Sequence, residues 1–188
     1  MKLMIASLFL ILGTIPTLVA GDTTVGGAKF SESLTLGEQT LLLTGAGLRK
    51  KLFIKVYAGA LYAAKPSNQA DELIAAGGNK SMRMHIIYKS ISAKKIRDAW
   101  TEGLKNNLAA DKFTVIEARL EEFNQLFPDL QKNDVIEMNF QPGVGTEVVL
   151  NGESRGNVEG DDFFSSLLLV WIGDKPADEN LKKGILGQ

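Results

Sequence analysis

The sequence contains no cysteine, and this absence excludes several kinds of site. Without thiols the chain can form neither a disulfide framework nor a thiolate metal site, and it has no thiol nucleophile. The single histidine, His85, cannot supply a cluster of imidazole ligands, and no carboxylate spacing matches a calcium loop. We therefore expect no metal site. Because no nucleophile-elbow motif accompanies His85, we expect it to be a partly exposed strand residue without a catalytic role.

An excess of charge of either sign is also lacking, since 21 basic residues are balanced by 22 acidic ones. A nucleic-acid partner is therefore not expected, because such a partner requires a basic surface. Two glycine-containing stretches, residues 45–47 and 143–145, do not have the glycine spacing and following helix of a nucleotide-binding loop. We expect no cofactor.

Long hydrophobic runs are absent after the first residues of the chain. The N-terminus carries a positive start, an apolar run over residues 3–15 and a small-residue exit, which is typical of a secretory signal peptide. Cleavage after Ala20 or Gly21 fits this pattern, and an uncleaved membrane anchor is the alternative. The run is short for a membrane span, which needs about 20 apolar residues. We predict a signal peptide at residues 1–20 and one periplasmic or secreted domain at residues 21–188, with no stable membrane span after cleavage.

Hydrophobic periodicity in that domain predicts strands before and after a group of helices. Strands are expected at residues 30–36, 40–44, 48–62, 82–88 and 135–140, and Asn151-Gly152 predicts a hairpin turn. Helices are expected at residues 68–76, from Ser92 onward, around residues 116–127, from Asp161 onward and near residues 180–186. This order favours an α+β fold with a largely antiparallel sheet covered on one face by helices.

The strand predicted at residues 48–62 is the most informative segment. Alternation gives it two faces, one with Leu52, Ile54, Val56, Ala58 and Ala60 for the core, the other with Arg49, Lys51, Phe53, Lys55 and Tyr57. The second face is either a solvated surface or the wall of an anion site. Arginine and tyrosine together can hold a carboxylate. In an unbroken strand, however, Arg49 and Tyr57 would lie about 26 Å apart, at roughly 3.3 Å per residue. A shared anion therefore requires a break or bulge between Arg49 and Phe53.

Two longer stretches of the sequence resemble a known family. They are G-x-G-L-R-K-K with F-I-K-V-Y-A-G-A-L-Y, and F-F-S-S-L-L-L-V-W-I-G-D-K-P near the C-terminus. Both resemble the chalcone isomerase-like family, and its exported bacterial branch in particular, over residues 36–186. The resemblance implies an open-faced β-sandwich, in which a large antiparallel sheet carries a layer of helices on one face. It also implies that the strand with the arginine is interrupted.

The family includes true isomerases and non-catalytic fatty-acid-binding relatives, which differ at a few positions. The resemblance aligns the oxyanion-stabilising arginine with Arg49. It places Tyr57, which the fatty-acid-binding relatives carry, at the position of the catalytic threonine. The catalytic tyrosine and asparagine align with Ile96 and Gly103, and a polar position of the last helix aligns with Phe164. Most of the polar set of the isomerases is therefore absent here.

The leading hypothesis is non-catalytic binding of a fatty acid or similar amphiphilic carboxylate. Arg49 and Tyr57 would hold the head group, and the apolar wall would comprise Ile96, Trp100, Phe163, Phe164 and Leu167. One alternative is an isomerase, an intramolecular lyase acting on a chalcone-like enone, in which Arg49 stabilises an oxyanion and Tyr57 or Tyr88 handles the proton. A second alternative is a structural or partner-binding module, in which the cleft has collapsed and Arg49 pairs with an internal acidic residue such as Glu38.

Overall fold

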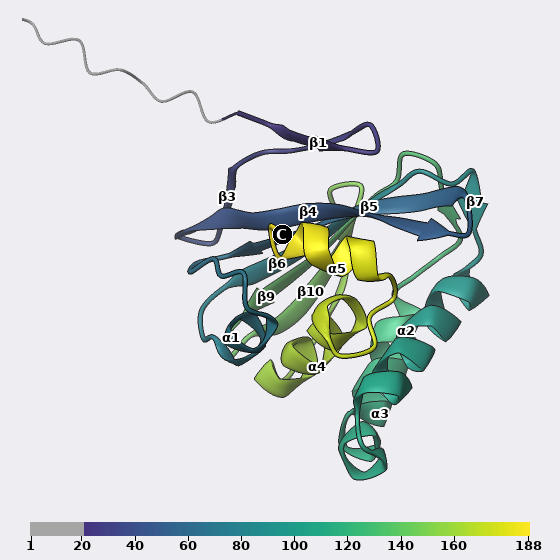
Figure 1. The fold of residues 1–188 in the computed structure, drawn as a ribbon. Helices are drawn as coiled ribbons and strands as arrows, with labels where there is room; N and C mark the ends of the chain where they lie inside the picture. Colours follow the sequence, from purple (N-terminus) through teal and green to yellow (C-terminus); the bar gives the residue numbers. More distant parts are fainter. Residues whose placement is uncertain (1–20) are drawn as a thin grey trace, which may run out of the picture.

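An antiparallel sheet of seven strands lies at the centre of the structure, with helices on one face (Figure 1). The computed structural model describes residues 21–188, so the signal peptide expected at residues 1–20 lies outside the described residues. From edge to edge the sheet consists of β11 (Glu153–Val158), β10 (Gly145–Leu150), β9 (Val135–Gln141), β6 (Lys80–Ile86), β5 (Ile54–Ala63), β4 (Gln39–Lys51) and β3 (Ser33–Leu36). All neighbouring strands are antiparallel.

Two small two-stranded sheets and five helices accompany the central sheet. The first small sheet is the hairpin of β1 (Thr23–Val25) with β2 (Ala28–Phe30), and the second pairs β7 (Ser90–Ile91) with β8 (Leu130–Gln131). The helices are α1 (Ala70–Ala75), α2 (Ala93–Asn107), α3 (Ala110–Gln125), α4 (Asp161–Ile172) and α5 (Glu179–Ile185). This arrangement confirms the predicted α+β class.

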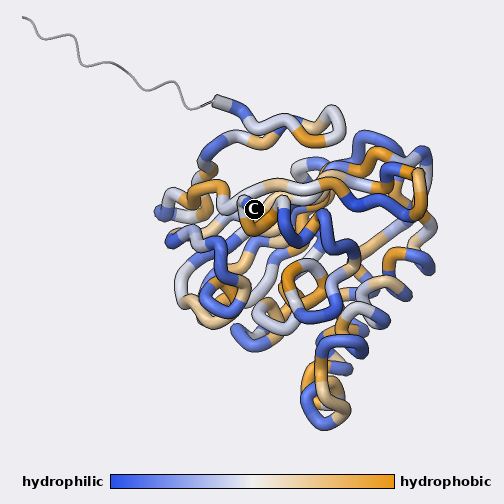
Figure 2. Tube along the Cα trace, in the orientation of Figure 1, coloured by the Kyte–Doolittle hydropathy of each residue, from blue (hydrophilic) through white to orange (hydrophobic). Residues whose placement is uncertain are grey.

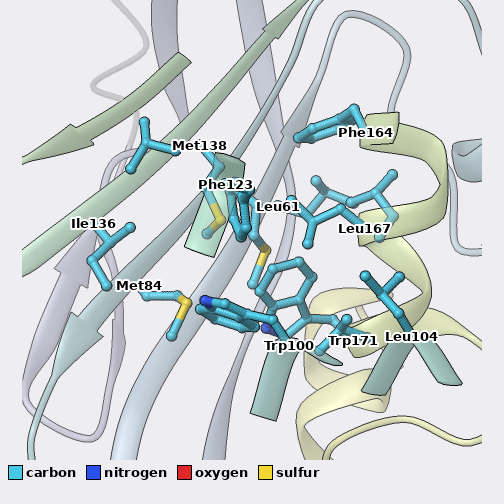
Figure 3. Packing of buried hydrophobic residues seen from close by; sticks show 14 of the residues in the cluster. Leu61, Met84, Trp100, Leu104, Phe123, Ile136, Met138, Phe164, Leu167 and Trp171 are labelled. Carbon is cyan, nitrogen blue, oxygen red and sulfur yellow. The ribbon is translucent and has the colours of Figure 1, made fainter. Parts of the chain in front are cut away.

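The main hydrophobic core lies between the sheet and the helices (Figure 3). Helix α2 buries Ile96, Trp100 and Leu104, the apolar stripe that the four-residue spacing predicts. Ser92 caps this helix as expected, because its side chain accepts a hydrogen bond from the backbone N–H of Lys95. The burial of this apolar stripe therefore fixes the position of α2 over the sheet.

A smaller hydrophobic cluster covers the opposite face of the sheet, beneath the β1–β2 hairpin (Figure 1). Its buried members are Phe30, Leu41, Ala58, Ala60 and Tyr62. His85 lies beside this cluster, half-buried on β6, with its ring edge-on to Phe30 at 4.7 Å between centroids. The predicted partly exposed strand position of His85 is therefore confirmed.

The prediction of one strand over residues 48–62 is wrong. A two-residue turn at Leu52 and Phe53 separates β4 from β5, and Lys51 pairs with Ile54 across it. The predicted apolar face therefore divides: Leu52 and Ile54 are exposed, whereas Ala58 and Ala60 lie in the smaller cluster. The two faces are not continuous because a turn, unlike a strand, does not preserve the two-residue period of side chains.

Local turn chemistry predicts other parts of the chain correctly. Asn151 and Gly152 both adopt positive φ between β10 and β11, as an Asn-Gly hairpin requires. Helix α1 differs in detail, since Gln69 occupies its N-cap position without a side-chain cap, and neither Ser67 nor Asn68 occupies that position.

Candidate ligand-binding site

Arg49 and Tyr57 lie directly opposite each other on β4 and β5. The turn at Leu52 and Phe53 reverses the chain, and a register shift follows Arg49. The guanidinium carbon of Arg49 lies 5.6 Å from the centroid of the Tyr57 ring, within range of a cation–π contact. The interruption that a shared anion requires is therefore present as a hairpin, and the 26 Å separation does not arise.

Tyr57 is buried on the face of the sheet that the helices cover, where it forms a hydrogen bond with α4. Its ring is 1% exposed, and its hydroxyl oxygen accepts a 3.0 Å hydrogen bond from Nε1 of Trp171 on α4. Burial raises the pKa of Tyr57 to about 12, against opposing effects of Arg49 and of this hydrogen bond. The phenol therefore keeps its proton at neutral pH. Because Trp171 supplies a donor, the O–H of Tyr57 remains free to donate to a ligand.

Arg49 carries a charge that the described part of the chain does not neutralise. Its Nε is buried and has no hydrogen-bond partner among residues 21–188, and Arg49 takes part in none of the salt bridges found there. The structural alternative expected an internal acidic partner such as Glu38, but Glu38 lies in the turn before β4, at the opposite end of that strand. A buried unpaired donor is costly, so an anionic partner is the expected complement.

Two cavities meet at Arg49, and both are also lined by Ala99 and Glu102 of α2. The larger has a volume of about 500 Å³ and extends from Arg49 to Leu52 and Ile54 at the end of the hairpin. The smaller has a volume of about 180 Å³ and reaches Tyr57. The larger cavity is within the size range of small-molecule sites, whereas the smaller one suits only a head group or water.

The predicted wall residues separate into two groups. Ile96 lines the larger cavity and Trp100 the smaller one. Phe163, Phe164 and Leu167 lie in the main core instead and line neither cavity. Figure 3 shows Phe164 and Leu167 within this core. Phe164 stacks on Phe140 at 5.0 Å between ring centroids, and Phe163 packs edge-on against Phe123 at 5.5 Å. The structure therefore brings together Arg49, Tyr57, Ile96 and Trp100.

Sequence reasoning did not identify the loop after α4, which lines the smaller cavity through Lys175, Pro176 and Ala177. Asn107, at the end of α2, holds this loop. Its side-chain amide donates to the carbonyl oxygen of Lys175 at 2.9 Å and accepts from the backbone N–H of Lys175 at 2.8 Å. No local sequence signal reveals this pairing, because the two residues are 68 positions apart.

The glycines before Arg49 allow α5 to pack closely against β4. A Cβ atom on Gly47 would lie 2.6 Å from the carbonyl oxygen of Leu181, and one on Gly184 would lie 2.6 Å from the carbonyl oxygen of Ala46. Glycine is therefore required where these backbones approach. Asp178 extends this contact, since its carboxylate accepts a 3.0 Å hydrogen bond from the backbone N–H of Lys50.

Comparison with known proteins agrees with this architecture. A sequence model described as chalcone isomerase-like matches residues 22–187. The chain belongs to the chalcone isomerase-like family. Within the curated proteins, it is similar to fatty-acid-binding protein 1 of Arabidopsis thaliana, with 27% identity over 186 residues and 84% of this chain covered. The chain spans 66% of the length of that relative.

The fold of this family member is shared with a solved structure. The crystal structure of an Arabidopsis thaliana fatty-acid binding protein matches it with a TM-score of 0.70 at 24% identity, covering 88% of this chain and 96% of the other. This likeness confirms the predicted chalcone isomerase type of fold. Within residues 21–188, no helix has both the length and the apolar character needed to cross a membrane.

Proposed function

We propose that this member of the chalcone isomerase-like family binds a fatty acid or similar amphiphilic carboxylate without transforming it. The observation that carries this proposal is the unpaired, partly buried guanidinium of Arg49 beside the free O–H of Tyr57. Arginine stays charged when desolvated and offers parallel donors to a carboxylate. In the proposed complex Arg49 and Tyr57 donate to the carboxylate oxygens, and Trp171 keeps the phenol in position.

The larger cavity is proposed to hold the acyl chain. Its lining includes Val56, Ile91 and Ile96 as well as the exposed Leu52 and Ile54. Each methylene removed from water contributes about 0.8 kcal/mol, so affinity should rise with chain length until the cavity is full. Asp98 and Glu102 also line the cavity, but both are exposed to solvent. Their charges favour a head group placed at Arg49 rather than along α2.

Catalysis of the isomerase kind lacks support at the same site. Closing an enone requires a group that accepts a proton, and Tyr57 with a pKa of about 12 holds its own proton at neutral pH. The positions aligned with the catalytic tyrosine and with a polar residue of the last helix are the buried Ile96 and Phe164. We expect purified protein to cyclise chalcone no faster than buffer. Cyclisation of chalcone by the parent protein that is lost in Arg49→Ala would contradict this expectation and favour the isomerase.

We also propose that the protein is exported, on the strength of the signal-peptide pattern of residues 1–20. Intact-mass measurement of protein from a periplasmic extract tests this. A mass corresponding to cleavage after Ala20 or Gly21 is expected. Full-length protein retained in the membrane fraction would instead favour the uncleaved anchor.

A calorimetric titration with laurate tests the binding proposal. Arg49→Ala removes the anion's partner and should weaken laurate binding between tenfold and hundredfold, about 1.5–3 kcal/mol. Dodecanol, which has the same chain without the charge, should bind parent and variant alike. Arg155→Ala is the matched control, because Arg155 is exposed on β11. Equal laurate affinity in parent and Arg49→Ala, with unchanged circular dichroism, would refute the proposal. No uptake by the parent would favour a structural role.

A further inference from the structure

The end of the β4–β5 hairpin, residues 50–55, exposes three consecutive apolar side chains. Phe53 is 98% exposed, Leu52 87% and Ile54 51%. The other large exposed hydrophobic residues of the described chain, Leu42, Val115 and Val144, are scattered over different elements. Single exposed apolar residues are ordinary, but three together at the tip of a projecting hairpin indicate an interaction surface.

The backbone at this tip is strained at Leu52, the first residue of the two-residue turn. Leu52 adopts φ of 56°, in the left-handed region, where a non-glycine residue costs about 1–2 kcal/mol. Glycine or asparagine would fit such a two-residue turn with less strain. Since Leu52 is almost fully exposed, burial within this chain does not offset the cost. Pairing of β4 with β5 holds Leu52 in this conformation, so its apolar side chain stays exposed at the tip.

Three lysines flank the apolar tip, in a chain whose net charge is −1. Lys50, Lys51 and Lys55 are all exposed, and none forms a salt bridge within residues 21–188. Figure 2 shows the resulting pattern, a hydrophobic stretch between hydrophilic ends. The carboxylates nearby are Asp178, which binds the backbone N–H of Lys50, and those of α2 across the larger cavity. The tip itself carries only positive charge.

We propose that residues 50–55 dock on the surface of an anionic lipid bilayer. Leu52, Phe53 and Ile54 enter the interface between head groups and acyl chains, and the lysines bind anionic head groups. An apolar contact flanked by cations is the combination that holds peripheral proteins at such surfaces. A second copy of the chain is a poor occupant, because two tips of like charge repel.

The docking surface adjoins the larger cavity. Leu52 and Ile54 line that cavity together with Arg49 and Lys51, so the cavity extends to the hairpin end that is proposed to dock. An amphiphile leaving the bilayer could enter past the tip without crossing water. This use of the surface rests on the proposed function, whereas docking itself rests only on the hairpin.

Vesicle co-sedimentation tests docking with no fatty acid added. The protein used is residues 21–188, which contain every described element and both hydrophobic clusters and which include the entire family match. Phosphatidylcholine vesicles containing phosphatidylglycerol are compared with phosphatidylcholine alone. The apolar variant is Leu52→Ser with Phe53→Ser, and the charge variant replaces Lys50, Lys51 and Lys55 by Gln. Their controls are Val115→Ser with Val144→Ser, and Gln in place of the exposed Lys29, Lys65 and Lys132.

The parent and both controls should bind the anionic vesicles, and binding should fall with added salt. The charge variant should bind roughly a hundredfold more weakly, from about 1 kcal/mol per lysine. A Phe53→Trp variant should show a blue-shifted emission on vesicle binding. No binding by the parent, equal binding by the hairpin variants, or dimerisation that the apolar variant abolishes would each overturn the proposal. Laurate titration of a Phe53→Ser variant without vesicles separates the two proposals, because Phe53 lines neither cavity and the laurate affinity of this variant should match the parent's.

Discussion

The indole nitrogen of Trp171 donates a 3.0 Å hydrogen bond to the hydroxyl oxygen of Tyr57 across the main core. This contact joins α4 to β5 and determines how the phenol can be used. With one lone pair engaged by Trp171, the hydroxyl is oriented and its proton is available to an acceptor near Arg49. Helix α4 therefore contributes to the site through Trp171, although Trp171 itself lines neither cavity.

Alkaline pH should reveal the burial of Tyr57. A folded-state pKa of about 12 against an ordinary 10.0 means that the folded protein holds this proton more tightly. The resulting stability is present below pH 10.0 and is lost as the pH rises toward 12, by about 3 kcal/mol in total. Urea denaturation at several pH values measures this loss, which Tyr57→Phe should reduce. The raised pKa of Tyr62 affects parent and variant alike. An identical alkaline loss in both proteins would contradict the assignment.

A larger side chain at the junction of the two cavities should weaken ligand binding. Ala99 is half-buried on α2 and lines both cavities, so Ala99→Phe should obstruct the ligand space. We expect laurate affinity to fall about tenfold or more, equivalent to about 1.4 kcal/mol. Ala118→Phe, at an exposed position of α3, is the control and should bind normally. Unaltered laurate affinity in Ala99→Phe would show that the ligand does not occupy these cavities.

The approach of α5 to β4 should make Gly47 intolerant of a side chain. A Cβ atom there would lie 2.6 Å from the carbonyl oxygen and 3.0 Å from the Cα of Leu181, so α5 would have to move. Gly47→Ala should lower the free energy of unfolding by about 2–4 kcal/mol. Gly77→Ala is the matched comparison, because nothing lies within 4 Å of its added atom. Urea denaturation of both variants measures the difference, and similar stabilities would be inconsistent with the described packing.

Local signals predicted those parts of the fold in which local chemistry decides the conformation. The spacing of Ile96, Trp100 and Leu104 defines the buried face of α2, and Asn151-Gly152 defines a turn. The β4–β5 turn has no such signal, since neither Leu52 nor Phe53 is one of the residue types that favour turns. The turn forms because pairing along β4 and β5 outweighs the local preference of Leu52 for negative φ.

The candidate site was only partly predictable for a related reason. Arg49 and Tyr57 stand out in the sequence as polar residues in an apolar segment, and the family resemblance supplies their pairing. Which aromatic residues face a cavity depends on side-chain packing, which periodicity does not reveal. Phe164 and Trp100 are both buried on helices, yet only Trp100 lines a cavity. Their surroundings differ because Phe164 stacks on Phe140 of the sheet.

Native mass spectrometry with extraction of co-purifying ligand tests the central claim most directly. Parent and Arg49→Ala proteins are isolated in parallel, and the extracted lipids are identified. The account predicts a fatty acid or similar amphiphilic carboxylate bound to the parent and none bound to folded Arg49→Ala. Equal amounts of the same ligand in both proteins, or a parent that stays empty even after incubation with laurate, would contradict a carboxylate site headed by Arg49.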